Sequence, residues 1–149
     1  TLVNTKTNDE DEDTVGVSLD SFDEDLDLSD LSNEEITLLN GTSRNRDILR
    51  EAKIELDKAS PDLQLIGSLI NDHHSILRDD LNVSTKKIER MLEAAISAGA
   101  FGGKINGSGG GGCMFAYAPE DPKAVANAIE LAGGKAHIIT ADEGTKVLI

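Results

Sequence analysis

The chain has 149 residues and a formal net charge of −14, from 28 acidic and 14 basic side chains. One or at most two domains fit this length. The acidity argues against a nucleic-acid-binding protein, which needs a basic face for phosphates, and against binding to an anionic membrane. No apolar run approaches the roughly 20 residues of a membrane-spanning helix. The single cysteine excludes an intramolecular disulfide. Together these features predict a cytoplasmic protein without nucleic-acid or membrane partners.

Most of the negative charge lies near the start of the chain. Residues 1–35 hold 13 acids and one base, whereas residues 36–149 have a net charge of only −2. The acidic run Asn8–Asp13 has no apolar side chain to bury and lacks the residue order of an EF-hand calcium loop. We therefore predict an acidic leader or connector over residues 1–32 and a folded domain over residues 33–149. The start at Thr1, without an initiator methionine, suggests a piece of a longer protein.

Three helices are predicted first. Ser32–Glu35 has the capping-box pattern, which opens a helix at about Asn33. Gly41–Ser43 is expected to bend or interrupt this helix, and Ser60-Pro61 to end it. The second helix has apolar residues at helical spacing and ends near Asp80. The third is expected to open at Ser84 and to end at Ala98-Gly99.

Short extended segments follow the third helix. Residues 103–106 and 113–118 are predicted strands, and the β-prone run in 113–118 is the clearer of the two. Asp121-Pro122 is an N-cap followed by proline at the first helical position, so a fourth helix follows. Residues 136–140 and 146–149 are two further predicted strands. The order predicts an α+β fold, with helices packed on one face of a small four-stranded antiparallel sheet.

A glycine-rich segment joins the first two predicted strands. Eight of the 14 glycines fall between Gly99 and Gly112, and the densest run is 107–112. Such a cluster serves turns with positive φ, or a close approach of backbone N–H groups to a phosphate. A dinucleotide-binding loop requires a following helix, whereas a strand follows here. The spacing alone therefore leaves open an anion site or a flexible hairpin.

The segment Lys104–Cys113 resembles the third sequence motif of the GHMP small-molecule kinases, which include galactokinase, homoserine kinase, mevalonate kinase and phosphomevalonate kinase. The segment Ile70–Asp80, followed by Asn82–Ser84, resembles galactokinase in particular. In that branch a histidine recurs four residues before Arg-Asp-Asp. The matching residues are His74, Arg78, Asp79 and Asp80. The resemblance covers about residues 33–149 and implies the C-terminal, ferredoxin-like domain of this family. Mevalonate kinase is the alternative, because it shares a very similar glycine loop.

The resemblance implies ATP-dependent phosphorylation of a small alcohol, with galactose as the favoured substrate and Mg²⁺ as the cofactor of the complete enzyme. The catalytic motifs of the family's N-terminal domain are absent from this chain. We therefore expect no catalytic residue and no metal ligand here, no tightly bound cofactor, and no activity without a partner N-terminal kinase domain. The residues expected to bind nucleotide or substrate are Asn106, Gly107, Ser108, Gly109, Gly110, Gly111 and Gly112. The family loop often has bulkier residues at the positions of Gly110 and Gly111.

Four further residues are expected to support the loop rather than to bind the substrate: His74, Arg78, Asp79 and Asp80. A shared metal ion at His73-His74 is disfavoured because adjacent side chains on a helix point about 100° apart. Two other functions remain open from the residues alone. One is a non-catalytic, ligand-binding regulatory module. The other is an interaction protein whose acidic leader docks on basic partners.

Overall fold

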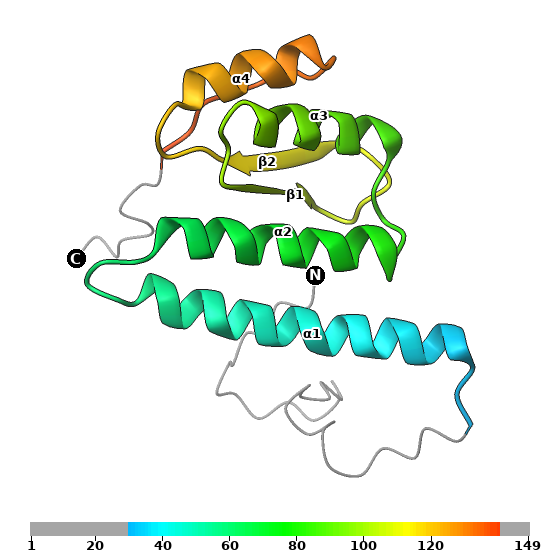
Figure 1. The fold of residues 1–149 in the computed structure, drawn as a ribbon. Helices are drawn as coiled ribbons and strands as arrows, with labels where there is room; N and C mark the ends of the chain where they lie inside the picture. Colours follow the sequence, from blue (N-terminus) through cyan, green and yellow to red (C-terminus); the bar gives the residue numbers. More distant parts are fainter. Residues whose placement is uncertain (1–29, 141–149) are drawn as a thin grey trace, which may run out of the picture.

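The computed structural model describes residues 30–140 of the chain. The described elements, in chain order, are α1 (Asn33–Leu56), α2 (Leu63–Asp79), α3 (Lys86–Ser97), β1 (Gly102–Asn106), β2 (Cys113–Tyr117) and α4 (Pro122–Leu131). Figure 1 shows α1 and α2 as an antiparallel pair below the β1–β2 ribbon, with α3 and α4 on its other side. No helix within residues 30–140 is long and apolar enough to cross a membrane.

Helix α1 begins where the sequence predicts. Ser32 Oγ accepts a hydrogen bond from the N–H of Glu35, and the Glu35 carboxylate accepts one from the N–H of Ser32, which is the capping box. The expected interruption at Gly41–Ser43 was wrong, because α1 is continuous to Leu56. Gly41 is buried, and a Cβ there would lie only 3.1 Å from Asp80 Cβ. This glycine therefore allows α1 to pack closely against the end of α2. Residues 1–29 of the predicted acidic leader lie outside the described residues.

The turn between α1 and α2 is held by a buried carboxylate. Glu55 is only 3% exposed and accepts hydrogen bonds from the N–H of Asp62, at 2.7 Å, and from Lys58 Nζ, at 2.5 Å. The Asp62 N–H and the Lys58 ammonium together hold the pKa of Glu55 below its usual value. Asp62 in turn caps α2 by accepting from the N–H groups of Gln64 and Leu65. The hairpin is thus fixed by polar contacts at its closed end.

The strands form an antiparallel ribbon, with Gly102 opposite Tyr117 and Asn106 opposite Cys113. Helices α3 and α4 cover one of its faces. Ile105 of β1 is buried in a cluster with three residues of α3, namely Ile88, Met91 and Leu92. A second cluster brings Val125 of α4 against Ala95 and Ala100. Helix α3 begins at Lys86 rather than at Ser84, because Thr85 is its N-cap.

Helix α2 lies along the edge of β1 that β2 leaves free, as Figure 1 shows. A Cβ at Gly67 would lie 2.5 Å from Phe101 Cβ, and one at Gly102 would lie 2.1 Å from the Gly67 oxygen, so only glycine allows this approach. The Asn71 amide donates to the Phe101 oxygen and accepts from the Gly103 N–H. The helix thereby satisfies polar groups that a neighbouring strand would otherwise pair. The prediction that the helices share one face therefore holds for α3 and α4 but not for α2.

The α+β class is confirmed, but the predicted four-stranded sheet is not found: the sheet of the described residues has two strands. Residues 136–140 contain no strand. Ile138 and Ile139 are 52% and 83% exposed, and no described strand pairs with them. A β-prone sequence forms a strand only where a partner supplies the hydrogen bonds. The fourth predicted strand, 146–149, lies outside the described residues.

Candidate functional site: the glycine loop between β1 and β2

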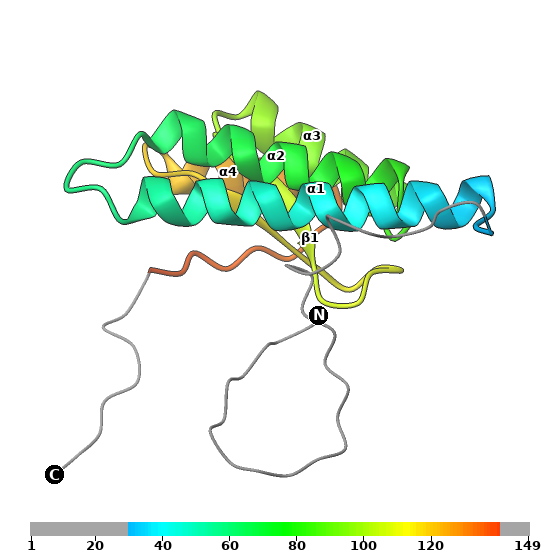
Figure 2. The ribbon, with the colours of Figure 1, turned by 90° about the horizontal axis from the view of Figure 1, so that it is seen from below.

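The loop at residues 107–112 has a backbone that only glycine adopts readily. Five of its six residues have φ between +76° and +131°: Gly107, Gly109, Gly110, Gly111 and Gly112. L-residues avoid this region because Cβ meets the backbone, which explains the composition of the loop. Figure 2 shows the loop, in yellow, extending beyond the helical layer. Backbone N–H groups of turns are one means by which proteins bind anions.

The loop is anchored on the connection between α2 and α3. The Gly110 N–H donates to the Val83 oxygen at 2.8 Å. A Cβ at Gly109 would lie 2.5 Å from Val83 Cβ, so the loop backbone lies directly against this valine. Val83 is itself held, because its N–H donates to the Leu77 oxygen at 2.9 Å. The loop is therefore fixed at its middle rather than only at its two ends.

The hydrogen bond between Gly110 and Val83 limits which loop N–H groups can donate to a ligand. The N–H of Gly110 is already used by Val83. Within the described part of the chain, the N–H groups of Gly107, Ser108, Gly109 and Gly111 have no hydrogen-bond partner. A ring of donors that runs unbroken from Gly107 to Gly111 is therefore not formed. The donors left for a ligand are those on either side of the anchored residue.

Two residues of β1 carry polar groups next to the loop. Asn106 is the last residue of the strand and is exposed. Lys104 alternates with the buried Ile105, so it lies on the sheet face opposite α3. Its Nζ donates to the Ile105 oxygen at 3.0 Å and lies 5.6 Å from the centre of the Phe115 ring. Burial lowers the pKa of Lys104 from its usual value.

The histidine pair does not form a metal site. Burial, with the nearby charges of Lys104 and His74, lowers the pKa of His73 to about 4, so this ring is neutral at pH 7. Among residues 30–140, no group of three or more His, Cys, Asp or Glu side chains is arranged to hold a metal ion. The described residues therefore do not fit a magnesium site, and we assign no magnesium ligand to them.

His74 contacts the strand that leads into the loop. It is 5% exposed, and its Nδ1 accepts the N–H of Ile105 at 3.3 Å. Because Nδ1 accepts, Nε2 carries the ring hydrogen, and it donates to Glu89 Oε1 at 2.9 Å. His74 thus links β1, two residues before the loop, to α3.

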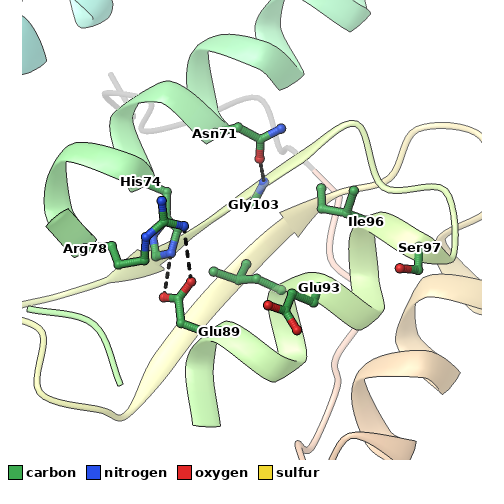
Figure 3. A pocket seen from close by; sticks show the side chains of 9 residues that line it. Asn71, His74, Arg78, Glu89, Glu93, Ile96, Ser97 and Gly103 are labelled. Carbon is green, nitrogen blue, oxygen red and sulfur yellow. Dashed lines mark hydrogen bonds and ion pairs between the residues drawn. The ribbon is translucent and has the colours of Figure 1, made fainter. Parts of the chain in front are cut away.

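Glu89 is the centre of this polar cluster, and Figure 3 shows it on α3 pointing toward His74 and Arg78 of α2. It accepts from Ser84 Oγ and His74 Nε2 through Oε1, and from Arg78 Nη1 at 3.5 Å through Oε2. Burial opposes ionisation of Glu89, but the hydrogen bonds from Ser84 and His74 and the charge of Arg78 outweigh it and hold the pKa below its usual value. Glu89 was not among the residues predicted from the sequence. The available signal was the polar series Asn71, His74 and Arg78, whose spacing of three and four residues places it along one face of α2.

The structure separates the residues of the Arg-Asp-Asp segment. Arg78 donates from Nε and Nη2 to the two oxygens of Asp79, both at 2.8 Å. Asp80 pairs with Arg44 of α1 at 3.7 Å. Thus His74 and Arg78 meet at Glu89, whereas the partners of Asp79 and Asp80 are arginines and not loop residues.

A pocket of about 350 Å³ lies between α2, α3 and β1, beside this cluster (Figure 3). Its lining includes Asn71, Arg78, Glu93 and Ser97, but no residue of the glycine loop. Its carboxylates do not suit a phosphate. The loop, with its unpartnered N–H groups, is therefore the better candidate for an anion site.

Comparison with known proteins places these features in a family. Residues 48–135, more than half of the chain and including the loop, match the model of the C-terminal domain of GHMP kinases. The mevalonate kinase of Thermococcus onnurineus is 50% identical over 94 residues, which cover 62% of this chain and 28% of that protein. The galactokinase of Mycobacterium bovis is 34% identical over 82 residues, which cover 52% of this chain and 23% of that protein.

A solved structure is similar as well. The mevalonate kinase of L. major, in complex with R-mevalonate, matches with a TM-score of 0.50 and 26% identity. The match covers 68% of this chain and 34% of that one. The chain therefore spans less than a third of the length of the curated relatives reported above.

Proposed function

Because the chain belongs to the GHMP kinases, as the match of residues 48–135 shows, we propose that it is the C-terminal domain of a mevalonate kinase-like phosphotransferase. The reaction is the transfer of a phosphoryl group from ATP to the hydroxyl of a small alcohol. The resemblance of residues 70–84 had favoured galactokinase. The higher identity to a mevalonate kinase, 50% against 34%, supports mevalonate as the substrate instead.

The observation that carries this proposal is the fixed glycine loop. Phosphoryl transfer depends mainly on positioning and on stabilisation of charge. The N–H groups of Gly107, Ser108, Gly109 and Gly111 are free to donate, and Gly110 holds the backbone in place through Val83. In the proposed role these donors, with Asn106, hold a phosphate or substrate oxygen. The catalytic base and the magnesium ligands belong to the part of the enzyme outside this chain.

The test is a pair of chimeric enzymes. Residues 48–135 replace the matching segment of the Thermococcus onnurineus mevalonate kinase in one, and of the Mycobacterium bovis galactokinase in the other. We expect the first to phosphorylate mevalonate within about tenfold of its parent, a loss of about 1.4 kcal/mol in transition-state stabilisation. We expect the second to lose most of its activity on galactose, because the loop and its supports must fit the companion domain.

Both chimeras are checked for folding by circular dichroism before they are assayed. An active galactokinase chimera beside a folded but inactive mevalonate kinase chimera contradicts the choice of mevalonate. Two folded but inactive chimeras contradict the proposal as a whole.

A further inference from the structure

Glu89 is connected to the glycine loop by two separate routes, each a series of hydrogen bonds and chain neighbours. The first begins with Ser84, whose Oγ donates to Glu89 Oε1. Ser84 follows Val83, whose oxygen accepts the N–H of Gly110 at 2.8 Å. This route fixes the connection between α2 and α3 on which the middle of the loop lies.

The second route passes through α2. His74 Nε2 donates to the same Glu89 oxygen at 2.9 Å, and His74 Nδ1 accepts the N–H of Ile105 at 3.3 Å. Ile105 is two residues before Gly107, where the loop begins. This route fixes the strand that enters the loop.

Among the described residues, no carboxylate other than that of Glu89 accepts a hydrogen bond from Ser84 or His74. Glu93 lies one helical turn further along α3 and lines the same pocket, but it makes no hydrogen bond to another described residue. Arg78 donates from Nη1 to Glu89 Oε2, while its Nε and Nη2 donate to Asp79. Oε1 of Glu89 therefore accepts the hydrogen bonds of both routes to the loop, from Ser84 and from His74. Oε2 accepts a hydrogen bond from the charged Arg78.

We infer that Glu89 is a positioning residue for the glycine loop: its carboxylate sets the place of Val83 and of Ile105, and through them the direction of the loop N–H groups. The inference rests on the proposed function, since it concerns the loop to which that function assigns the phosphate or substrate. Glu89 does not itself touch the ligand in this account.

The test is amide hydrogen exchange by NMR on the ¹⁵N-labelled 149-residue chain without ligand. In Glu89→Ala we expect the amides of Gly110 and Ile105 to exchange about fivefold faster, as hydrogen bonds worth about 1 kcal/mol are lost. The reference amide is that of Phe101, which donates to the Tyr117 oxygen at 2.8 Å at the far end of the ribbon. We expect its exchange to stay unchanged.

Two variants give a readout that a general loss of stability would not produce. In Glu89→Gln the amide oxygen can still accept from Ser84 and His74, so we expect protection of both loop amides to return. In Ser84→Ala only the first route is cut, so we expect faster exchange of Gly110 and unchanged exchange of Ile105. Glu93→Ala is the matched control and should change neither amide.

Three results would overturn the inference. One is unchanged exchange of Gly110 and Ile105 in folded Glu89→Ala. The second is an equal acceleration of Phe101 in that variant, which would make Glu89 a general stabilising residue. The third result, which can be obtained even if Glu89→Ala does not fold, comes from Ser84→Ala. It is faster exchange of both Gly110 and Ile105 in that variant, or of neither. The chimeric enzymes test the proposed function separately, because the exchange experiment involves neither substrate nor turnover.

Discussion

Gly109 and Gly107 have nearly the same backbone but different surroundings. Their φ angles are +85° and +84°, so alanine is strained to a similar degree at both, by about 1–2 kcal/mol. Only at Gly109 does the added Cβ meet Val83, at 2.5 Å, whereas a Cβ at Gly107 has nothing within 4 Å. The difference between the two positions therefore isolates the contact that anchors the loop.

We expect Gly109→Ala to lower the free energy of unfolding more than Gly107→Ala, by a further 1 kcal/mol or so. Urea denaturation of the two variants measures this difference. Equal losses in the free energy of unfolding would show that the loop does not pack against Val83 in solution.

Among the elements, the close contact between α2 and β1 depends on glycine. A Cβ at Gly67 would lie 2.5 Å from Phe101 Cβ and 2.6 Å from its backbone. Alanine is better than glycine in a helix by about 1 kcal/mol, but here the helix must move away from the strand. We expect Gly67→Ala to be destabilising by about 1–3 kcal/mol in urea denaturation. The control is Ser68→Ala at the exposed neighbouring position, which should change the free energy of unfolding by less than about 0.5 kcal/mol. An equally small effect of Gly67→Ala would contradict the close packing of α2 against β1.

A second prediction about contacts between elements concerns the closed end of the α1–α2 hairpin. Glu55 is buried and accepts from Lys58 and from the Asp62 N–H, whereas Glu51, one turn earlier on α1, is exposed. We expect Glu55→Ala to lower Tm clearly in a thermal unfolding experiment, because it leaves the Asp62 N–H without its acceptor. Glu51→Ala should leave Tm nearly unchanged. Equal Tm values would mean that Glu55 does not hold this turn.

Local signals in the sequence predicted most elements. Ser32 and Asp121 cap helices where the sequence placed them, because capping depends on residues three positions apart. The place of α2 at the β1 edge was not predictable, since it depends on Gly67 and Gly102, which are distant in sequence. The same holds for the site: the glycine loop follows from composition, whereas the roles of Val83 and Glu89 follow only from tertiary contacts. The segment 136–140 has strand-forming residues, but no described strand pairs with it.

For the molecule as a whole, His73 links folding to pH. The pKa of His73 is about 4 in the folded protein, against 6.5 for an ordinary histidine. Between pH 7 and pH 5 the unfolded chain takes up a proton that the folded chain does not, so stability falls as the solution is acidified. Because His73 is only half-buried, solvent screening reduces this effect, and we expect it to be about 1 kcal/mol.

Urea denaturation at pH 7 and pH 5 measures this dependence. We expect the loss of stability on acidification to be smaller in His73→Gln than in the wild-type chain. The exposed His137→Gln serves as the control and should behave like the wild type. If His73→Gln loses as much stability as the wild type, His73 is not the group responsible.

The proposed role of the glycine loop is to bind a phosphate or substrate oxygen through its free N–H groups, in a kinase whose other parts lie outside this chain. A titration of the ¹⁵N-labelled chain with Mg²⁺ and ATP, followed by NMR, tests it most directly. We expect weak binding, with a dissociation constant on the order of 1 mM, because in the proposed role this chain supplies only part of the binding site. The amide shifts should be largest at Gly107, Ser108, Gly109 and Gly111 and small at Gly110, whose N–H remains bonded to Val83. Shifts confined to the pocket between α2 and α3, or micromolar binding by the chain alone, would contradict the account, and the second result would favour a regulatory module.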